Sequence, residues 1–353
     1  MSEFKRIAID TSKSVFTLHG VGADERPLLR KTLSRSALLP FLSRLAPTEI
    51  ALEACGSAHH WARQVQALGH APRLIPPQYV KPFVKRGKND RNDAEAISEA
   101  ASRPGMRSVP VKTTERQAQT CTLGVRDLLV RQRTQLVNAL RGHAAEFGAV
   151  APRSVAGLAT LKTALRDTDL PAEARETFDF LIRQIERLDQ EIKILDARLT
   201  AQHKANPVTR MLAGIPGIGP IGALTLAARV DPAQFASGRH LAAWIGLTPQ
   251  EHSTGGRQQM GGISRAGDER LRQLLVLGAT SVIRHVVARQ AAAAAGKSVP
   301  PGPLGAALEA WLVSLLERRP RKLCAVALAN KMARIAWAMM TSGEQYRRRT
   351  AAA

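Results

Sequence analysis

The stretch FKRIAID at residues 4–10 reads as a β-strand, because its residues alternate and the apolar run stops at a carboxylate. Outward from it, Ser14–Val21 and Pro27–Leu33 also have strand patterns, and Ser36–Leu45 has the spacing of an amphipathic helix. The next strand, EIALE at residues 49–53, is short and apolar and again ends in a carboxylate. Elements in this order predict a mixed α/β domain.

The following residues continue the alternation of strands and helices. Gly56–Leu68 has helical spacing, Pro72–Ile75 is a strand closed by two prolines, and Asn92–Ala101 is a further helix. Three strands, a helix, and then strands alternating with helices is the chain order of the ribonuclease H-like fold. We therefore predict that α/β fold for residues 1–105.

The remainder of the chain is predicted to be almost wholly helical. We expect a helical linker at residues 106–206, with long helices at about 114–147 and about 172–203, and a mainly α-helical C-terminal domain at residues 207–345. The second long helix carries an a/d seam made of Leu181, Ile185, Leu188, Ile192, Leu195 and Leu199. This seam pairs either with the first long helix, as a coiled-coil hairpin, or with another subunit.

Net charge is the strongest signal in the composition. Lysine and arginine number 51 against 29 acidic residues, which gives a formal charge of +22 and an isoelectric point near 11.1. Such an excess favours a polyanionic partner, most simply nucleic acid, although an arginine-rich proteome would also raise it. The three cysteines lack metal-site spacing and are expected to be small core residues. Because no apolar run reaches the roughly 18–20 residues of a membrane span, we expect no membrane partner and a cytoplasmic bacterial protein, nucleoid-associated when bound.

Four carboxylates stand at the ends of predicted elements. Asp10 and Glu53 each close a strand, while Asp90 and Asp93 lie three residues apart at the start of a helix and therefore on one face of it. Carboxylates that converge repel one another, and Mg²⁺ (or Mn²⁺) relieves that repulsion through the oxygen ligands it prefers. Two such ions about 4 Å apart support phosphoryl transfer. Taken singly, each acid could instead be a turn or helix-cap residue.

Three motifs around these acids resemble those of one family: DTSK from Asp10, EACG from Glu53, and KNDRNDAEA from Lys88. Later segments agree with it, namely GIPGIG at 214–219, LAAWIGLTP at 241–249, HSTGG at 252–256, GISRAGD at 262–268 and NKMARIAW at 330–337. Together they resemble the DEDD-type transposases of the insertion-sequence 110 family and its 1111 subgroup, over nearly the whole chain. The resemblance implies a RuvC-like N-terminal domain, a helical linker and a C-terminal transposase domain.

The same resemblance implies roles for individual residues. Asp10, Glu53, Asp90 and Asp93 match the catalytic, metal-binding carboxylates, and Ser253 matches a serine nucleophile, with its neighbour Thr254 as the alternative alignment. A serine that attacks a phosphodiester gives a covalent phosphoserine and conserves the bond energy, so that a second strand can be joined without ATP. A turn serine without chemistry is the simpler reading of the residue alone.

Nucleic-acid contacts are expected in the C-terminal domain. The segment 214–219 resembles a helix-hairpin-helix, in which Gly217 and Gly219 would let the backbone approach a phosphate; a tight turn that packs two helices is the alternative. Five arginines flank the serine loop and could hold DNA: Arg239, Arg257, Arg265, Arg270 and Arg272. The resemblance further implies recombination of donor and target DNA guided by a structured bridge RNA, in a homo-oligomer (dimer or tetramer) in which one subunit's serine completes another's carboxylates.

Two other functions remain compatible with the sequence. A structure-selective DNA endonuclease of the Holliday-junction resolvase type would need the carboxylates but not Ser253. A non-catalytic basic nucleic-acid-binding protein would need neither, and would leave the order and spacing of the four acids as coincidence.

Overall fold

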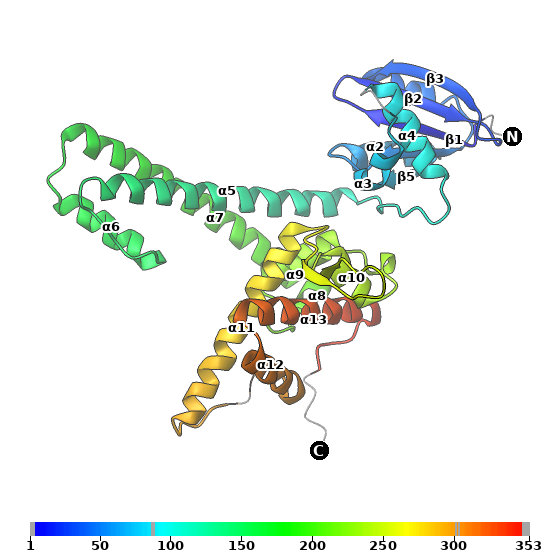
Figure 1. The fold of residues 1–353 in the computed structure, drawn as a ribbon. Helices are drawn as coiled ribbons and strands as arrows, with labels where there is room; N and C mark the ends of the chain where they lie inside the picture. The colour runs from blue at the N-terminus through cyan, green and yellow to red at the C-terminus, as the bar shows by residue number, and fades with distance from the viewer. Residues whose placement is uncertain (1–3, 86–88, 301, 303, 348–353) are drawn as a thin grey trace. The chain divides into compact units, whose positions relative to one another are not determined.

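The computed structural model describes residues 4–85, 89–300, 302 and 304–347. The chain forms two compact units, Met1–Thr114 and Glu115–Ala353 (Figure 1). The first is a mixed α/β unit and the second is mostly helical. The second unit contains the predicted C-terminal domain and the predicted linker from residue 115 onward, whereas residues 106–114 of the linker belong to the first unit. The division of the chain into three domains stays a prediction.

The first unit is built on a mixed sheet, which has five strands among the residues described. In chain order these are β1 (Arg6–Thr11), β2 (Val15–Val21), β3 (Pro27–Ser34), β4 (Glu49–Glu53) and β5 (Ala71–Ile75). The spatial order is β3-β2-β1-β4-β5, in which β1, β2 and β3 are antiparallel neighbours and β4 and β5 run parallel to β1. This topology is compatible with the predicted ribonuclease H-like fold.

The alternation within β1 and β4 assigns one kind of side chain to each face of the sheet. Bulky residues such as Ile9 and Leu52 pack with Trp61 of α2 (Ala58–Ala67) on one face. Small residues point to the other face, where Ala8 and Ala51 pack against α4 (Asp90–Ser102). Because alanine projects little from the sheet, α4 can approach the ends of these two strands closely.

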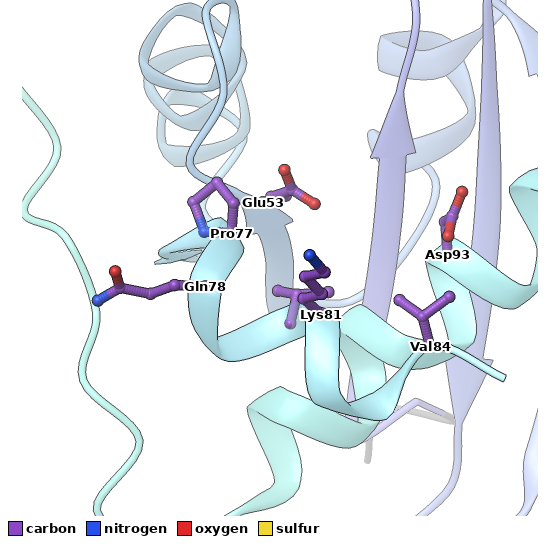
Figure 2. A pocket seen from close by; sticks show the side chains of 7 residues that line it. Glu53, Pro77, Gln78, Lys81, Val84 and Asp93 are labelled. Carbon is purple, nitrogen blue, oxygen red and sulfur yellow. The ribbon is translucent and has the colours of Figure 1, made fainter.

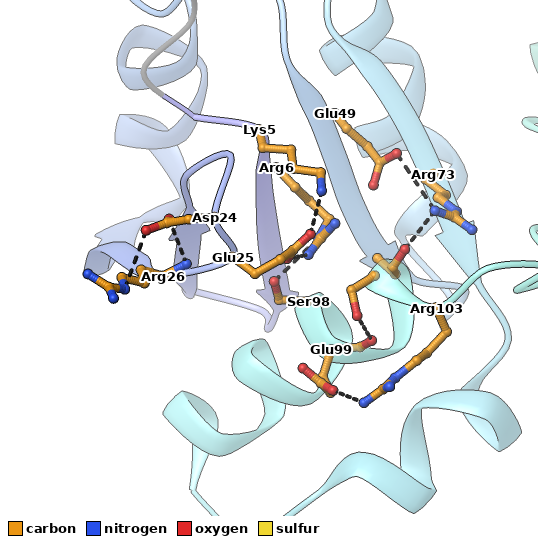
Figure 3. A network of polar contacts seen from close by, with 12 residues as sticks. Lys5, Arg6, Asp24, Glu25, Arg26, Glu49, Arg73, Ser98, Glu99 and Arg103 are labelled. Carbon is orange, nitrogen blue, oxygen red and sulfur yellow. Dashed lines mark hydrogen bonds and ion pairs between the residues drawn. The ribbon is translucent and has the colours of Figure 1, made fainter.

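Two arginines, one buried and one partly buried, attach α4 to the sheet (Figure 3). The Arg6 guanidinium, 3% exposed, donates to Ser98 Oγ at 3.4 Å and pairs with Glu25. Arg73 of β5 donates to the carbonyl oxygens of Ala101 and Met106 at 2.8 and 3.1 Å, just where α4 ends. Hydrogen bonds from charged donors are stronger than neutral ones, so these contacts fix the helix that carries Asp90 and Asp93.

The second unit begins with an antiparallel helical hairpin. Its helices are α5 (Thr114–Ala145) and α7 (Ala172–Ala205), with α6 (Val155–Asp167) between them in the chain. Arg126 of α5 pairs with Asp196 of α7, and Arg133 donates to Asp189 at 2.8 Å. The partner on α7 lies seven residues earlier when the arginine on α5 lies seven residues later, as expected for antiparallel helices. The seam residues Ile185, Ile192 and Leu199 are buried and the other three are partly buried. The seam therefore pairs with a helix of the same chain, and a coiled coil with another subunit stays a prediction.

The rest of the second unit shares one apolar core. Its elements are α8 (Pro207–Leu212), α9 (Pro220–Arg229), α10 (Gly238–Trp244), β6 (Pro249–Glu251), β7 (Met260–Ile263), α11 (Glu269–Ala294), α12 (Ala306–Arg318) and α13 (Arg321–Ser342). The helices bury residues such as Leu241, Leu275 and Leu328, which pack together. The strands β6 and β7 form an antiparallel hairpin whose side chains are mostly exposed.

Two of these helices, α11 and α13, are long and apolar enough to cross a membrane by length and composition alone. Neither helix contains an uninterrupted apolar run of that length, because charged residues such as Arg284 and Arg334 divide them, so the expectation from sequence is not contradicted. Both helices also contribute buried residues to the core of the second unit. Their apolar character is thus explained by core packing, as in many soluble proteins.

Other predictions were wrong in detail. The helix expected over Ser36–Leu45 is only α1 (Leu38–Leu42) after a short 3₁₀ turn. The helices α6 and α10 and the β6–β7 hairpin were not predicted. Among the cysteines, Cys324 is buried as expected, whereas Cys121 is exposed on α5 and is not a core residue.

Candidate active site

Parallel pairing brings two of the predicted carboxylates to one edge of the sheet. Ile9 of β1 is opposite Leu52 of β4, so Asp10 and Glu53 each follow by one residue. Each carboxylate comes two residues after the alanine of its strand, Ala8 or Ala51. Alternate residues of a strand point to the same face, so both carboxylates point toward the face covered by α4. Both side chains are half-buried.

The first turn of α4 supplies the other two carboxylates. Asn89 is the N-cap of this helix, and its Oδ1 accepts from the Arg91 and Asn92 amides at 2.8 and 3.1 Å. Asp90 is therefore not needed as the cap, which removes the simplest alternative role for it. Lys88 of the KNDRNDAEA motif lies outside the described residues.

Carboxylate oxygens of Asp10, Asp90 and Asp93 lie within 4.8 Å of one another. Burial raises the pKa of Asp10 to about 6, with further increases from Asp93, Asp90 and Glu53. Burial, and then Asp93, also raises the pKa of Glu53, which lies beside the cluster rather than within it. The side chains of all four residues therefore share one region of negative potential.

Among the described residues, no lysine or arginine neutralises this charge through an ion pair. In the described part of the first unit, the other acidic residues, Asp24, Glu25, Glu49, Glu95 and Glu99, each pair with a lysine or arginine. Over those same residues, neither the three aspartates of the cluster nor Glu53 forms an ion pair. In a protein with 51 lysines and arginines, this exception among the described residues favours the cluster as a binding site for another cation.

The donor set fits a hard divalent cation. Mg²⁺ and Mn²⁺ prefer carboxylate oxygens and usually take only a few of them, leaving positions for water or phosphate oxygens. Asp10, Asp90 and Asp93 have carboxylate oxygens within 4.8 Å of one another, close enough to bind one ion together, and Glu53 lies beside them. This set satisfies that preference. A cation bound beside Asp10 would favour its ionised form and so oppose this rise in pKa.

A pocket of about 330 Å³ opens next to the cluster (Figure 2). Glu53 and Asp93 line it together with Lys81, Gln78, Pro77, Val80 and Val84. Lys81 begins a 3₁₀ turn after α3 (Pro77–Val80), and it forms no ion pair with any described residue. Sequence reasoning did not single out Lys81, and the only signal was a lysine shortly after the double proline that closes β5.

Ser253 lies in the turn between β6 and β7, within the second unit. Its hydroxyl donates to Glu251 Oε1 at 2.7 Å and accepts from the Gln259 amide at 3.2 Å. Thr254 pairs with Arg257 across the turn through backbone hydrogen bonds at 3.0 and 3.3 Å. Both side chains are exposed. Ser253 differs from Thr254 in having a hydroxyl oriented by two partners.

The glycine turn between α8 and α9 has a packing role. Gly217 has φ +89°, and a Cβ there would lie 2.8 Å from the carbonyl oxygen of Gly278 on α11. Gly219 is the N-cap of α9 and has open space where a Cβ would be. Close packing thus accounts for Gly217, while contact of either glycine with a phosphate stays a prediction.

The five predicted DNA-binding arginines fall into two groups. Arg239, Arg257 and Arg265 are exposed, and Arg265 has φ +54°. Arg270 instead pairs with Asp127 of α5, and Arg272 donates to the Ile245 and Ala266 carbonyl oxygens at 2.7 Å each. The last two have internal partners that explain them structurally, and DNA binding by any of the five stays a prediction.

Two family models match parts of the chain. Residues 7–147 match a transposase model for the DEDD domain of IS110 elements, and residues 209–294 match the model described as the transposase IS116/IS110/IS902 family.

Three relatives cover nearly the whole chain. A Sinorhizobium fredii protein, provisionally named a transposase, is 51% identical over 97% of this chain and 85% of its own. The transposase for insertion sequence element IS1111A of Coxiella burnetii is 37% identical over 98% and 92%, and that for IS1328 of Yersinia enterocolitica is 38% identical over 96% and 97%. The chain therefore belongs to the IS110 family of DEDD transposases.

Proposed function

We propose that this transposase cleaves and rejoins the DNA strands of an insertion sequence through a covalent phosphoserine on Ser253. The observation that carries the proposal is the cluster of Asp10, Asp90 and Asp93, which forms no ion pair with any described residue of a strongly basic chain. Divalent cations held there, Mg²⁺ by preference, would stabilise charge on the phosphate and on the leaving oxygen.

The residues of the chain divide the work. Asp10, Asp90, Asp93 and Glu53 hold the cations, and exposed basic side chains, among them Arg239, Arg257 and Arg265, bind the DNA backbone. The Ser253 oxygen attacks phosphorus, and the sugar oxygen leaves with the bonding electrons. Attack by a second strand's hydroxyl on the phosphoserine reverses these steps and releases the serine.

Guidance by a structured bridge RNA and assembly as a dimer or tetramer are further parts of this proposal. The net charge of +22 supports a second nucleic-acid partner besides DNA. The exposed Phe180 and Ile194 side chains on α7 support contact with another subunit. Sequence choice would then come from base pairing rather than from side chains.

Lys81 extends the site toward the DNA backbone. It is a cation in the pocket that Glu53 and Asp93 line. Because it forms no ion pair with a described residue, it is available for a non-bridging oxygen of a phosphate. We expect Lys81→Met to weaken DNA binding about 10-fold, the size of one lost charge-assisted contact, and to lower the slope of log affinity against log salt by about one. Fluorescence anisotropy with a labelled duplex of the element end, over a series of salt concentrations, measures both.

Two variants act as controls. Lys81→Arg keeps the charge and is expected to restore most of the affinity, while Lys85→Met removes a nearby lysine that already pairs with Glu95 at 2.6 Å and should have little effect. Equal affinity and an equal salt slope for Lys81→Met and the wild-type protein would exclude the phosphate contact.

A further inference from the structure

The hydrogen bonds of Ser253 are those of a nucleophile paired with a base. Its Oγ donates its only proton to the Glu251 carboxylate at 2.7 Å. The same oxygen accepts from the Gln259 N–H at 3.2 Å, which uses one of its two lone pairs. The second lone pair stays free to attack an electrophile, and the proton already points at its acceptor.

The local structure explains why these two side chains meet. Glu251 is the last residue of β6, and in extended backbone residues i and i+2 point to the same side. The backbone pairing continues past β6, because the His252 amide donates to the Gln259 carbonyl oxygen at 2.8 Å. Gly255 and Gly256, with φ of +55° and +76°, then turn the chain. The hairpin thus holds the Glu251–Ser253 pair through its own backbone.

The carboxylate of Glu251 has no basic partner in the described part of the chain. Over the described residues it forms no ion pair with a lysine or arginine, although titratable and charged groups, His252 and Arg257, lie on the same hairpin. A carboxylate with a cation would be a weaker proton acceptor. Among the described residues, the Ser253 hydroxyl is thus a donor that the Glu251 carboxylate faces without a cation beside it.

We propose that Glu251 is the general base that activates Ser253, a proposal that rests on the proposed role of Ser253 as nucleophile. As the Oγ–phosphorus bond forms, the hydroxyl proton moves to the Glu251 carboxylate. The phosphorus–sugar oxygen bond breaks, and the leaving oxygen keeps the electron pair and takes a proton from water. In strand joining, the incoming hydroxyl gives its proton to water and the Glu251 carboxylic acid returns its proton to Oγ.

The test compares Glu251→Gln with the wild-type protein in the presence of Mg²⁺. Glutamine keeps the shape and can accept the hydroxyl's hydrogen bond, but it cannot take up a proton at neutral pH. The probe is a 5′-labelled duplex of the element end, with RNA transcribed from the adjacent non-coding segment, and covalent protein–DNA adduct is measured in single-turnover reactions on denaturing gels. We expect an adduct rate about 10²–10³-fold lower at pH 7.5, as for the loss of a general base, with unchanged DNA affinity.

A pH series separates base catalysis from a purely structural role. The ratio of wild-type to Glu251→Gln rates cancels the titration of the metal-site carboxylates, which both proteins share. It should fall toward one in acid, because a protonated carboxyl at position 251 can no longer accept the serine's proton. A ratio near one at pH 7.5, or a reduced rate whose ratio is the same at every pH, overturns the proposal. Glu317→Gln, a change at an exposed glutamate of α12, is the matched control and should react like the wild-type protein.

Ser253→Ala distinguishes failure of this proposal from failure of the proposed function. If Ser253→Ala abolishes the adduct while Glu251→Gln reacts normally, the nucleophile stands and Glu251 is not its base. If Ser253→Ala forms the adduct at the wild-type rate, the proposed function itself is wrong, and the role of Glu251 falls with it.

Discussion

Asparagine in place of Asp10 is expected to lower the rate of DNA strand cleavage by on the order of 10³-fold or more. The change removes one of three carboxylates that lie within 4.8 Å of one another, and with it the charge that holds divalent cations against the phosphate. Single-turnover cleavage of a labelled element-end duplex at saturating Mg²⁺ measures the effect. Cleavage at the wild-type rate would remove Asp10 from the chemistry.

The same variant is expected to be more stable than the wild-type protein in chelator. Because the pKa of Asp10 is raised to about 6 in the folded protein, its ionisation costs folding free energy as pH rises from about 4 to 6. Asparagine does not ionise, so the gain should be small at pH 4 and complete above pH 6. After allowance for solvent screening of a half-exposed group we expect about 1 kcal/mol, measured by urea unfolding in chelator at several pH values.

Glu99→Gln is the matched control for both measurements. Glu99 lies on the same helix, α4, but is exposed and pairs with Arg103. Its loss should leave cleavage unchanged and should give no stabilisation above pH 6. A gain for Glu99→Gln equal to that for Asp10→Asn would mean that general charge reduction, rather than repulsion within the cluster, causes the effect.

Alanine in place of Ser253 is expected to abolish the covalent protein–DNA adduct and strand joining, a loss of at least about 10⁴-fold. The substitution removes the only oxygen that can form the phosphoserine, and no other group in the hairpin has its pair of hydrogen bonds. Adduct is measured on denaturing gels and joined product by primer extension across the junction. Because the side chain is exposed, the fold should be unaffected.

Thr254→Ala decides between the two alignments of the nucleophile. It should retain both adduct and joining, because the Thr254 contacts across the turn are made by its backbone. Loss of the adduct in Thr254→Ala, with retention in Ser253→Ala, would move the nucleophile to Thr254. Retention of cleavage without any adduct in both variants would favour a resolvase-like endonuclease.

The carboxylate cluster was largely predictable because it depends on local rules. The strand pattern before Asp10 and Glu53 placed each side chain at the end of a strand and on a given face of the sheet. The spacing of Asp90 and Asp93 placed both on one face of a helix. The sequence could not show that Asn89 caps the helix and leaves Asp90 free, because both residue types cap helices well. It also could not show that Glu53 lies beside the cluster rather than in it, which depends on the packing of α4.

The serine hairpin shows where sequence reasoning failed. The strands β6 and β7 have only three and four residues, too few for an alternating pattern to stand out. Without the hairpin, Glu251 had no visible relation to Ser253. Arg270 and Arg272 illustrate the same limit, since surface arginines and arginines with internal partners look alike until the partners, here Asp127 and two carbonyl oxygens, are seen.

Calorimetric titration of the metal-free, full-length protein with MnCl₂ tests the metal site most directly, without any need for activity. We predict saturable binding by the wild-type protein and by Glu99→Gln, and binding at least about 10-fold weaker after Asp10→Asn combined with Asp93→Asn. Absence of binding by the wild-type protein, or equal binding by the double variant, would contradict a divalent-cation site built from these carboxylates.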